Sequence, residues 1–179
     1  NKQYGFDTLC LMPTNLYGPG DNYHYKDSHV IPALIRKFYE AKINNLKQVE
    51  CWGSGAPLRE FLHVYDLADA CVFALESWNP KGENSPKFDN GDTLHYLNVG
   101  SGFDQTIKSL ALMIASKVGF TGRITWDVNK KDGTPKKLLD ISRIKKLGWQ
   151  PKIDLLTGLE LTIKDFINNY EIGNIRKEN

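Results

Sequence analysis

The sequence has 179 residues, of which 41% are hydrophobic and 25% charged, and its net charge is +2. This composition is typical of a globular domain and excludes a disordered or fibrous chain. So small a net charge argues against a nucleic-acid binder, and no apolar run reaches the roughly 20 residues that a membrane span needs.

The first residues have the pattern of the end of an α/β crossover. Residues 1–5 read as a last helical turn that ends at Gly5, and residues 7–12 are a short apolar run without alternation. Such a run is typical of a parallel strand covered on both faces. Because a parallel strand needs partners, we expect further strands before residue 1 and interpret the chain as the C-terminal part of a longer α/β protein.

The loop that follows, "PTNLYGPGDN" at residues 13–22, is a candidate ligand loop. In open α/β sheets, ligands bind beyond the carboxyl ends of the strands. Its glycines and prolines would make a rigid loop whose backbone can approach a ligand closely. An ordinary surface turn explains the same composition.

The middle of the chain alternates helices and strands. Residues 28–42 form a predicted helix with Ser28 as N-cap, and residues 66–78 form a second one. Strands are predicted at residues 49–52 and 60–64. Residues 79–95 are polar and rich in breakers, so we expect a mobile surface insertion without chemistry.

The last part continues as a compact mixed α/β lobe. A buried strand at residues 96–100 precedes a helix from the cap Thr106 to the stop Gly119. The remaining expected elements are a strand at 123–127, a basic loop at 129–140, a short helix at 142–148 and a long amphipathic helix at 154–170. Residues 171–179 are expected to be a frayed tail.

Three side chains outside the expected core could carry chemistry. His29 lies at a predicted helix start and could transfer a proton, or could be a surface or capping residue. Trp52 offers a flat face for a base or sugar, or could belong to the core. Arg59 has a fork suited to phosphate, or could pair with an acid such as Asp66.

A run of lysines around the turn at Asp132 is a further candidate segment. Lysine runs are usually solvated faces. Together with Arg59, Arg36 and Lys37, however, the lysines at 130, 131, 136 and 137 could converge on a diphosphate.

Cysteine usage points to a reducing compartment. Cys10, Cys51 and Cys71 are odd in number and lie in apolar segments, so we expect reduced core thiols in a cytoplasmic protein. No histidine has metal-ligand spacing with them or with another histidine, so no metal site is expected.

Four segments together carry a family resemblance that covers the chain from residue 1 to about 170. They are "MPTNLYGPGDNY…SHVIPALIRKF", "WGSGAPLREFLHV", "LNVGSG" and "DGTPKKLLD". The sequence resembles the nucleotide-sugar enzymes of the extended short-chain dehydrogenase/reductase family, and among them the GDP-4-keto-6-deoxy-D-mannose 3,5-epimerase/4-reductases. The resemblance implies the C-terminal portion of an NAD(P)-binding Rossmann-type protein. Residues 1–25 would end the dinucleotide-binding domain, and residues 26–170 would be mainly the substrate lobe.

The resemblance also implies roles for individual residues. Pro13, Thr14, Asn15 and Leu16 would lie against the nicotinamide end of NADPH, and His29 would be the catalytic acid/base beside that cofactor. The residues expected to contact the GDP-sugar are Lys37, Trp52, Arg59, Asp132 and Lys137.

The expected reaction is epimerisation at C3 and C5, followed by reduction of C4 with NADPH. A 4-keto group acidifies the neighbouring protons, so a base such as histidine can remove them. The family's glycine-rich loop, its Tyr-x-x-x-Lys pair and its catalytic cysteine are not in this sequence, so we expect residues 1–179 alone to be inactive. A homodimer is expected for the whole enzyme. The alternatives are another nucleotide-sugar epimerase or dehydratase of the family, or a non-catalytic interaction domain.

Overall fold

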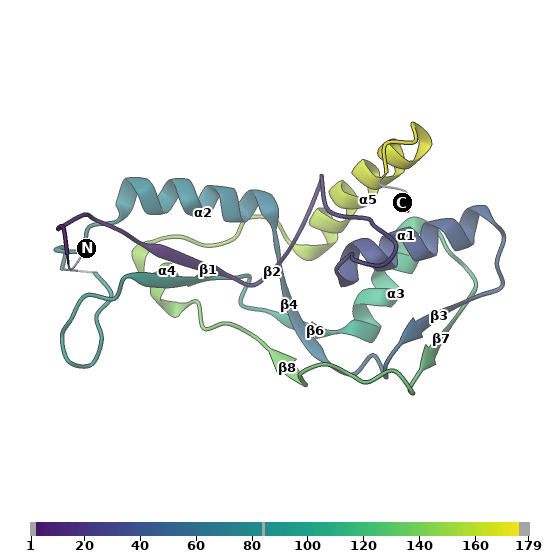
Figure 1. Ribbon diagram of the computed structural model, residues 1–179, viewed down its shortest axis with the longest axis horizontal. Coiled ribbons are helices and arrows are strands. Elements are labelled where there is room, and N and C mark those ends of the chain that lie inside the picture. Colours follow the sequence, from purple (N-terminus) through teal and green to yellow (C-terminus); the bar gives the residue numbers. More distant parts are fainter. Residues whose placement is uncertain (1–2, 84, 176–179) are drawn as a thin grey trace.

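The computed structural model describes residues 3–83 and 85–175, which form two adjoining regions along its longest axis (Figure 1). In chain order the elements are β1 (Cys10–Pro13), β2 (Asn15–Tyr17), α1 (Val30–Ile43), β3 (Gln48–Trp52), β4 (Leu58–His63), α2 (Val64–Ser77), β5 (Tyr96–Val99), β6 (Asp104–Thr106), α3 (Ile107–Val118), β7 (Arg123–Asp127), β8 (Lys136–Lys137), α4 (Ser142–Leu147) and α5 (Leu155–Glu171). The predicted mixed α/β fold is confirmed.

The strands within the described residues form three small sheets that are mostly parallel. β1 pairs with β5 in one region, and β3 pairs with β7 at the far end of the other (Figure 1). Between them, β4 is parallel to β2 and β8 and antiparallel to β6. β4 is therefore the strand around which the other segments of the middle sheet are arranged.

In the part of the chain that the structure describes, buried apolar side chains form two hydrophobic cores. The larger core packs α1, α3 and α5 together, with Phe38, Ile114 and Phe166 fully buried in it. The smaller core joins β1 and β5 to α2 and α4 through residues such as Leu97 and Ile144. Amphipathic spacing predicted these helices because their apolar side chains recur on one face.

Helix ends follow the local sequence closely. The Thr106 side chain accepts a hydrogen bond from Ser109 N at 3.0 Å, and Gly119 ends α3 with φ +81°. Both features agree with the prediction. The predicted cap of α1 is wrong by one residue, because His29 and not Ser28 occupies the N-cap, without a side-chain capping bond.

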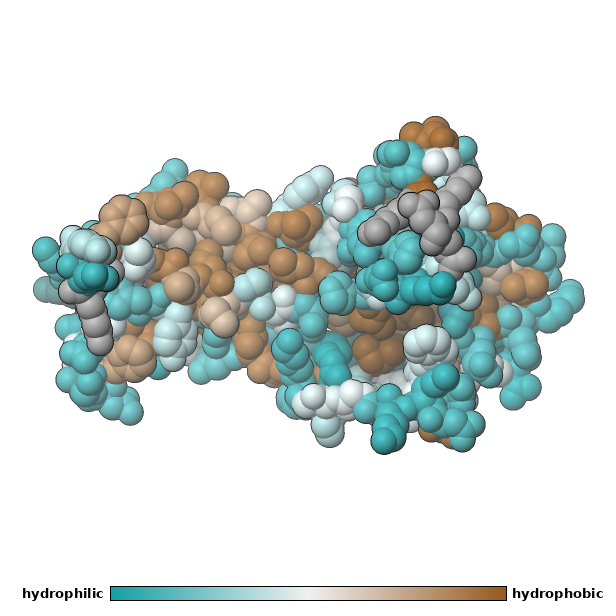
Figure 2. Space-filling model, viewed as in Figure 1, coloured by the Kyte–Doolittle hydropathy of each residue, from teal (hydrophilic) through white to brown (hydrophobic). Residues whose placement is uncertain are grey.

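β1 differs from the prediction of a strand buried on both faces. Met12 is 53% exposed, and Leu75 on the neighbouring α2 is 86% exposed, because the described elements leave one side of both uncovered. Figure 2 shows this apolar surface over β1 and α2. For the same reason the prediction of three core thiols is correct only for Cys51, whereas Cys10 and Cys71 are exposed free cysteines.

The segments outside the cores keep their predicted surface character in part. Within residues 79–95, turns and an isolated bridge between Lys87 and Thr93 accompany a fully buried Leu94. Gly5 follows a turn at residues 3–4 and has φ +67°, as expected for a left-handed position. Helix α5 extends to Glu171, so the predicted tail starts in a helix, and residues 1–2 and 176–179 lie outside the described residues. In the described residues no helix is long and apolar enough to cross a bilayer.

Truncation of Phe38 should strongly destabilise the larger core. Phe38 is 0% exposed and its ring centroid lies 5.6 Å from that of Phe120. Phe38→Ala should lower the free energy of unfolding by about 3–5 kcal/mol, because it removes buried apolar area and leaves a cavity. Equilibrium urea unfolding measures this loss. Leu112→Ala, at a 54% exposed position on α3, is the control, and an equal loss in both variants would contradict the prediction.

Candidate active site

A cleft of about 630 Å³ is lined by residues of β2 and β4, the start of α1, the end of β3 and the loop after β7. Its lining comes from four stretches that are distant in the sequence: Thr14, Asn15 and Leu16; His29, Val30 and Ile31; Trp52, Gly55, Pro57, Arg59 and Phe61; and Lys130, Lys131, Asp132 and Gly133, with Ile107 of α3. In Figure 2, apolar surface is recessed between hydrophilic rims in this part of the molecule.

The first wall of the cleft is fixed where the chain passes from β1 to β2. Thr14 N donates to Val99 O at 3.0 Å, and Thr14 Oγ1 donates to Glu60 O at 3.3 Å. Asn15 Nδ2 donates to the same carbonyl at 2.8 Å. These bonds leave the amide oxygen of Asn15 and the side chain of Leu16 as the groups this wall can offer to a ligand.

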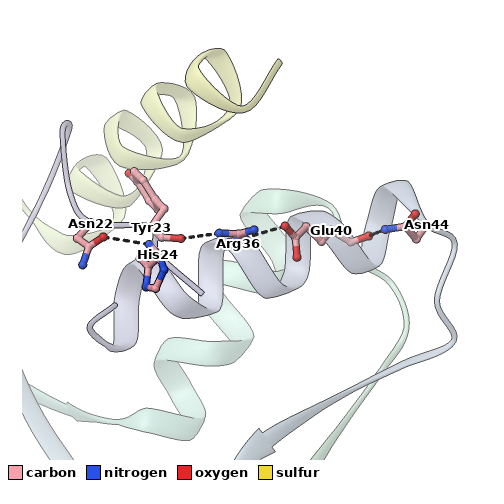
Figure 3. A network of polar contacts seen from close by, with 6 residues as sticks. All are labelled: Asn22, Tyr23, His24, Arg36, Glu40 and Asn44. Atoms are coloured by element: carbon pink, nitrogen blue, oxygen red, sulfur yellow. Dashed lines mark hydrogen bonds and ion pairs between the residues drawn. The ribbon is translucent and has the colours of Figure 1, made fainter. Parts of the chain in front are cut away.

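The second wall begins with His29, the exposed N-cap of α1. The loop before it is tied to the helix by Arg36, which donates through Nη1 to Tyr23 O at 2.9 Å and through Nε to Glu40 Oε1 at 2.8 Å (Figure 3). Asn22 Oδ1 accepts from His24 N at 3.1 Å in the same loop. The imidazole of His29 is thus presented at a helix start whose preceding loop is anchored.

The third wall carries an aromatic face and a cation. Trp52, the last residue of β3, is 71% exposed, which rules out its interpretation as a core residue. Lys130 Nζ lies 5.4 Å from the centroid of its ring, in a cation–π contact. A flat apolar face beside a positive charge suits a base or a sugar attached to a phosphate.

Arg59 is oriented by the backbone. Its Nη1 donates to Leu58 O at 2.8 Å and to Thr134 O at 2.6 Å. Asp66, the acid partner considered from sequence, instead accepts backbone bonds from Lys152 N and Ile153 N at 3.0 Å each. Arg59 therefore keeps its charge and its remaining N–H groups for the cleft.

Asp132 is held in place by Ser54 across the mouth of the cleft. Its Oδ1 accepts from Ser54 N at 2.9 Å and its Oδ2 from Ser54 Oγ at 2.6 Å. The hydroxyl bond and then the backbone bond of Ser54 lower the pKa of Asp132 below its usual value. The carboxylate is consequently ionised at neutral pH and faces the cleft as a fixed acceptor.

Gly53 allows this arrangement, so a side chain there should disturb it. Gly53 has φ +78°, and an added Cβ would lie 2.4 Å from Asp132 Oδ1. Gly53→Ala should cost about 1–2 kcal/mol of backbone strain and displace Asp132 from Ser54. We expect weaker binding of GDP, the ligand that the sequence resemblance implies, by calorimetry as well as lower stability in urea.

Gly91→Ala is the matched control for this change. Gly91 also has positive φ, +87°, but an added Cβ would have nothing within 4 Å. It should show the strain without the loss of GDP affinity. Equal GDP affinity of the two variants would show that the position of Asp132 does not matter for binding.

The cleft brings together most of the predicted site residues. Its lining includes seven of them: Thr14, Asn15, Leu16, His29, Trp52, Arg59 and Asp132. Pro13, Lys37 and Lys137 are outside this lining. Lys37 donates to Glu50 O and lines a neighbouring cavity of about 540 Å³ that shares Trp52 with the cleft.

The predicted convergence of cations is only partial. Lys130 and Lys131 line the cleft with Arg59, whereas Arg36 is paired with Glu40, and Lys136 Nζ lies 3.3 Å from Asp104 Oδ2.

Tyr17, from the candidate loop, is buried with its ring centroid 5.3 Å from that of His63. Among the described residues, no group of three potential ligands could hold a metal ion.

Sequence reasoning missed two residues that organise this site. Ser54 holds Asp132, and Glu60 holds Thr14 and Asn15 through its carbonyl. A detectable signal exists only for Glu60, because it is the charged first residue of a predicted strand whose next two residues, Phe61 and Leu62, are apolar. Ser54 had no such signal, since its partner is 78 residues away in the sequence.

Known proteins resemble both the sequence and the structure. Residues 1–86 match the NAD dependent epimerase/dehydratase family. A probable GDP-L-fucose synthase of Oryza sativa subsp. japonica is 50% identical over 93% of this chain, which covers 47% of that relative. The GDP-L-fucose synthase of Escherichia coli (strain K12) is 48% identical over 96% of the chain, covering 52% of the relative. The structure of a GDP-L-fucose synthetase from Naegleria fowleri bound to NADP matches with a TM-score of 0.79 and 28% identity, over 94% of this chain and 49% of that one.

The first part of the chain, residues 1–86, is similar to the NAD dependent epimerase/dehydratase family. The chain is also similar to the GDP-L-fucose synthases, as its motifs predicted. It spans about half the length of the curated relatives that it matches.

Proposed function

We propose that this chain is the substrate-binding C-terminal part of an enzyme that converts GDP-4-keto-6-deoxy-D-mannose to GDP-L-fucose. The reaction would be a 3,5-epimerisation followed by NADPH-dependent reduction of C4. The observation that carries the proposal is one cleft that collects a histidine, an exposed tryptophan, an oriented arginine and a fixed carboxylate. The similarity to GDP-L-fucose synthases supports the choice of substrate.

Each wall has a chemical role in this proposal. His29 takes the acidified proton at C3 or C5 of the 4-keto sugar, because its imidazole is exposed in the cleft and bears no capping bond. Arg59 binds the diphosphate with its free N–H groups, and Trp52 stacks on the base or sugar. Asp132 accepts hydrogen bonds from substrate hydroxyl or amine groups.

The segment from Pro13 to Leu16 fits one edge of a nicotinamide site. Asn15 has an amide oxygen left to accept a bond, and Leu16 adds an apolar contact at the same wall. NADPH, when bound there, supplies the hydride for C4. Residues 1–25 would complete the dinucleotide-binding domain, and residues 26–170 would form most of the substrate lobe. The proposal further includes a cytoplasmic homodimer for the complete enzyme and no activity for residues 1–179 alone.

The test is NADPH oxidation by the complete protein with GDP-4-keto-6-deoxy-D-mannose in D₂O. Oxidation at 340 nm together with deuterium at C3 and C5, detected by NMR, supports the proposal. The same assay with a UDP-4-keto sugar tests the base. If a folded, NADPH-binding protein acts on UDP-sugars alone, or exchanges no deuterium, the substrate assignment is wrong and another epimerase or dehydratase activity of the family takes its place.

A further inference from the structure

Glu60 occupies a place where a carboxylate is rarely found. It lies in the middle of β4 and is 0% exposed. Its Oε1 accepts from Gly102 N at 2.7 Å and its Oε2 accepts from Leu139 N at 2.9 Å. The loop before β6 approaches so closely that a Cβ on Gly100 would lie 2.3 Å from Oε1. One side chain thereby joins β4 to two segments that are far from it in the sequence.

Leu139 is the last residue of a segment that forms part of the cleft. We call residues 132–139 the strap. Its contacts with residues 54–60 are the Asp132–Ser54 bonds, Thr134 O with Arg59, Pro135 O with Leu58 N at 2.8 Å, the pairing of β8 with β4, and Leu139 N with Glu60. The strap lines the cleft at Asp132 and Gly133, and it orients Arg59 through Thr134.

We propose that Glu60 is a positioning residue that fixes the strap, and with it Arg59 and Asp132, in the geometry that binds the GDP-sugar. This inference rests on the proposed function. A carboxylate offers an acceptor oxygen to each of two donors, one from Gly102 and one from Leu139. A buried carboxylate that loses one of these hydrogen bonds leaves a polar group unsatisfied. Conformations in which the strap moves away from Glu60 are therefore unfavourable.

Glu60→Gln changes this arrangement with almost no change of volume. The amide keeps one acceptor oxygen and turns an NH₂ group toward the second backbone N–H, so the hydrogen bond to one of the two segments is lost. In the complete protein, amides of residues 132–139 should exchange with deuterium faster. The dissociation constant of GDP should rise about tenfold, as expected when one charged hydrogen-bond contact is weakened, while that of NADPH stays the same.

Asp66 provides a matched control. It is 2% exposed and also uses two carboxylate oxygens to accept two backbone bonds, but it lies on α2 outside the cleft lining. Asp66→Asn should lower stability without faster exchange in the strap, and its GDP dissociation constant should stay within about twofold of the parent value. Leu139→Pro removes the amide donor to Oε2, and it also restricts φ and replaces a side chain packed against the smaller core. It should reproduce the faster exchange of the strap and the weaker GDP binding of Glu60→Gln.

The outcomes separate positioning from plain stabilisation. Faster exchange in the strap with a selective loss of GDP affinity supports the role of Glu60. Unchanged exchange in the strap, or equal losses of GDP and NADPH affinity in the Glu60 and Asp66 variants, overturns it. A parent protein that binds UDP and not GDP refutes the proposed function instead, and the exchange of the strap still decides whether Glu60 holds it.

Discussion

Replacement of His29 by asparagine is expected to reduce deuterium incorporation at C3 and C5 of GDP-4-keto-6-deoxy-D-mannose about 10³-fold, the range of a lost general base. Asparagine cannot take a proton at neutral pH but is a favourable N-cap residue, so α1 should start at the same place. His29 makes no capping bond that the change would remove. NADPH oxidation should fall in parallel, because in the proposed function the epimerised sugar is the substrate of the reduction.

The measurement is NMR of the sugar in D₂O beside NADPH binding by fluorescence. His24→Asn is the control, because His24 lies in the same loop but outside the lining of the cleft. It should keep the exchange rate of the parent. If His29→Asn retained the exchange within a few-fold while folded and bound to NADPH, the base would be another group.

Replacement of Arg59 by lysine is expected to weaken GDP binding by about 10- to 100-fold. Lysine keeps the positive charge but loses the planar fork that Leu58 O and Thr134 O orient. A charge-assisted hydrogen bond contributes about 1.5–3 kcal/mol, which corresponds to this range of affinity. Calorimetric titration with GDP at two salt concentrations measures the loss and its electrostatic share.

Arg123→Lys makes the same chemical change far from the cleft. Arg123 is an exposed residue at the start of β7, whereas the cleft lining reaches the opposite end of its partner strand at Trp52. Its GDP affinity should equal that of the parent. A loss at Arg123 as large as that at Arg59 would mean that net charge, and not the oriented fork, governs binding.

Local sequence was sufficient to predict the elements whose ends and buried faces are determined by residues close to them in the sequence. α3 is the clearest case, because a threonine cap, an apolar face and a terminal glycine agree with one another. The exposure of β1 and α2 was not predictable in this way. An apolar run indicates that a segment is suited to burial, and it does not say which part of the protein covers it.

The site was predictable as a set of residues and not as a geometry. His29, Trp52 and Arg59 were candidates by chemical type, and the cleft does contain all three. Arg59 meets the segments of Asn15 and Asp132 through the parallel pairing of β2 and β8 with β4, which joins residues more than 40 positions apart. Single side chains such as Glu60 make that pairing specific, and no local pattern shows their partners.

The pairing of β1, near the start of the chain, with β5 restricts how chimeras of related proteins can be built. A graft of residues 26–170 would transfer β4 and β5 but leave β1 and β2 behind, so two strand pairs would become hybrids of donor and recipient. Thr14 of the recipient would then form its hydrogen bonds with Val99 and Glu60 of the donor. The smallest transplant that keeps every described strand beside its original neighbour starts at Cys10.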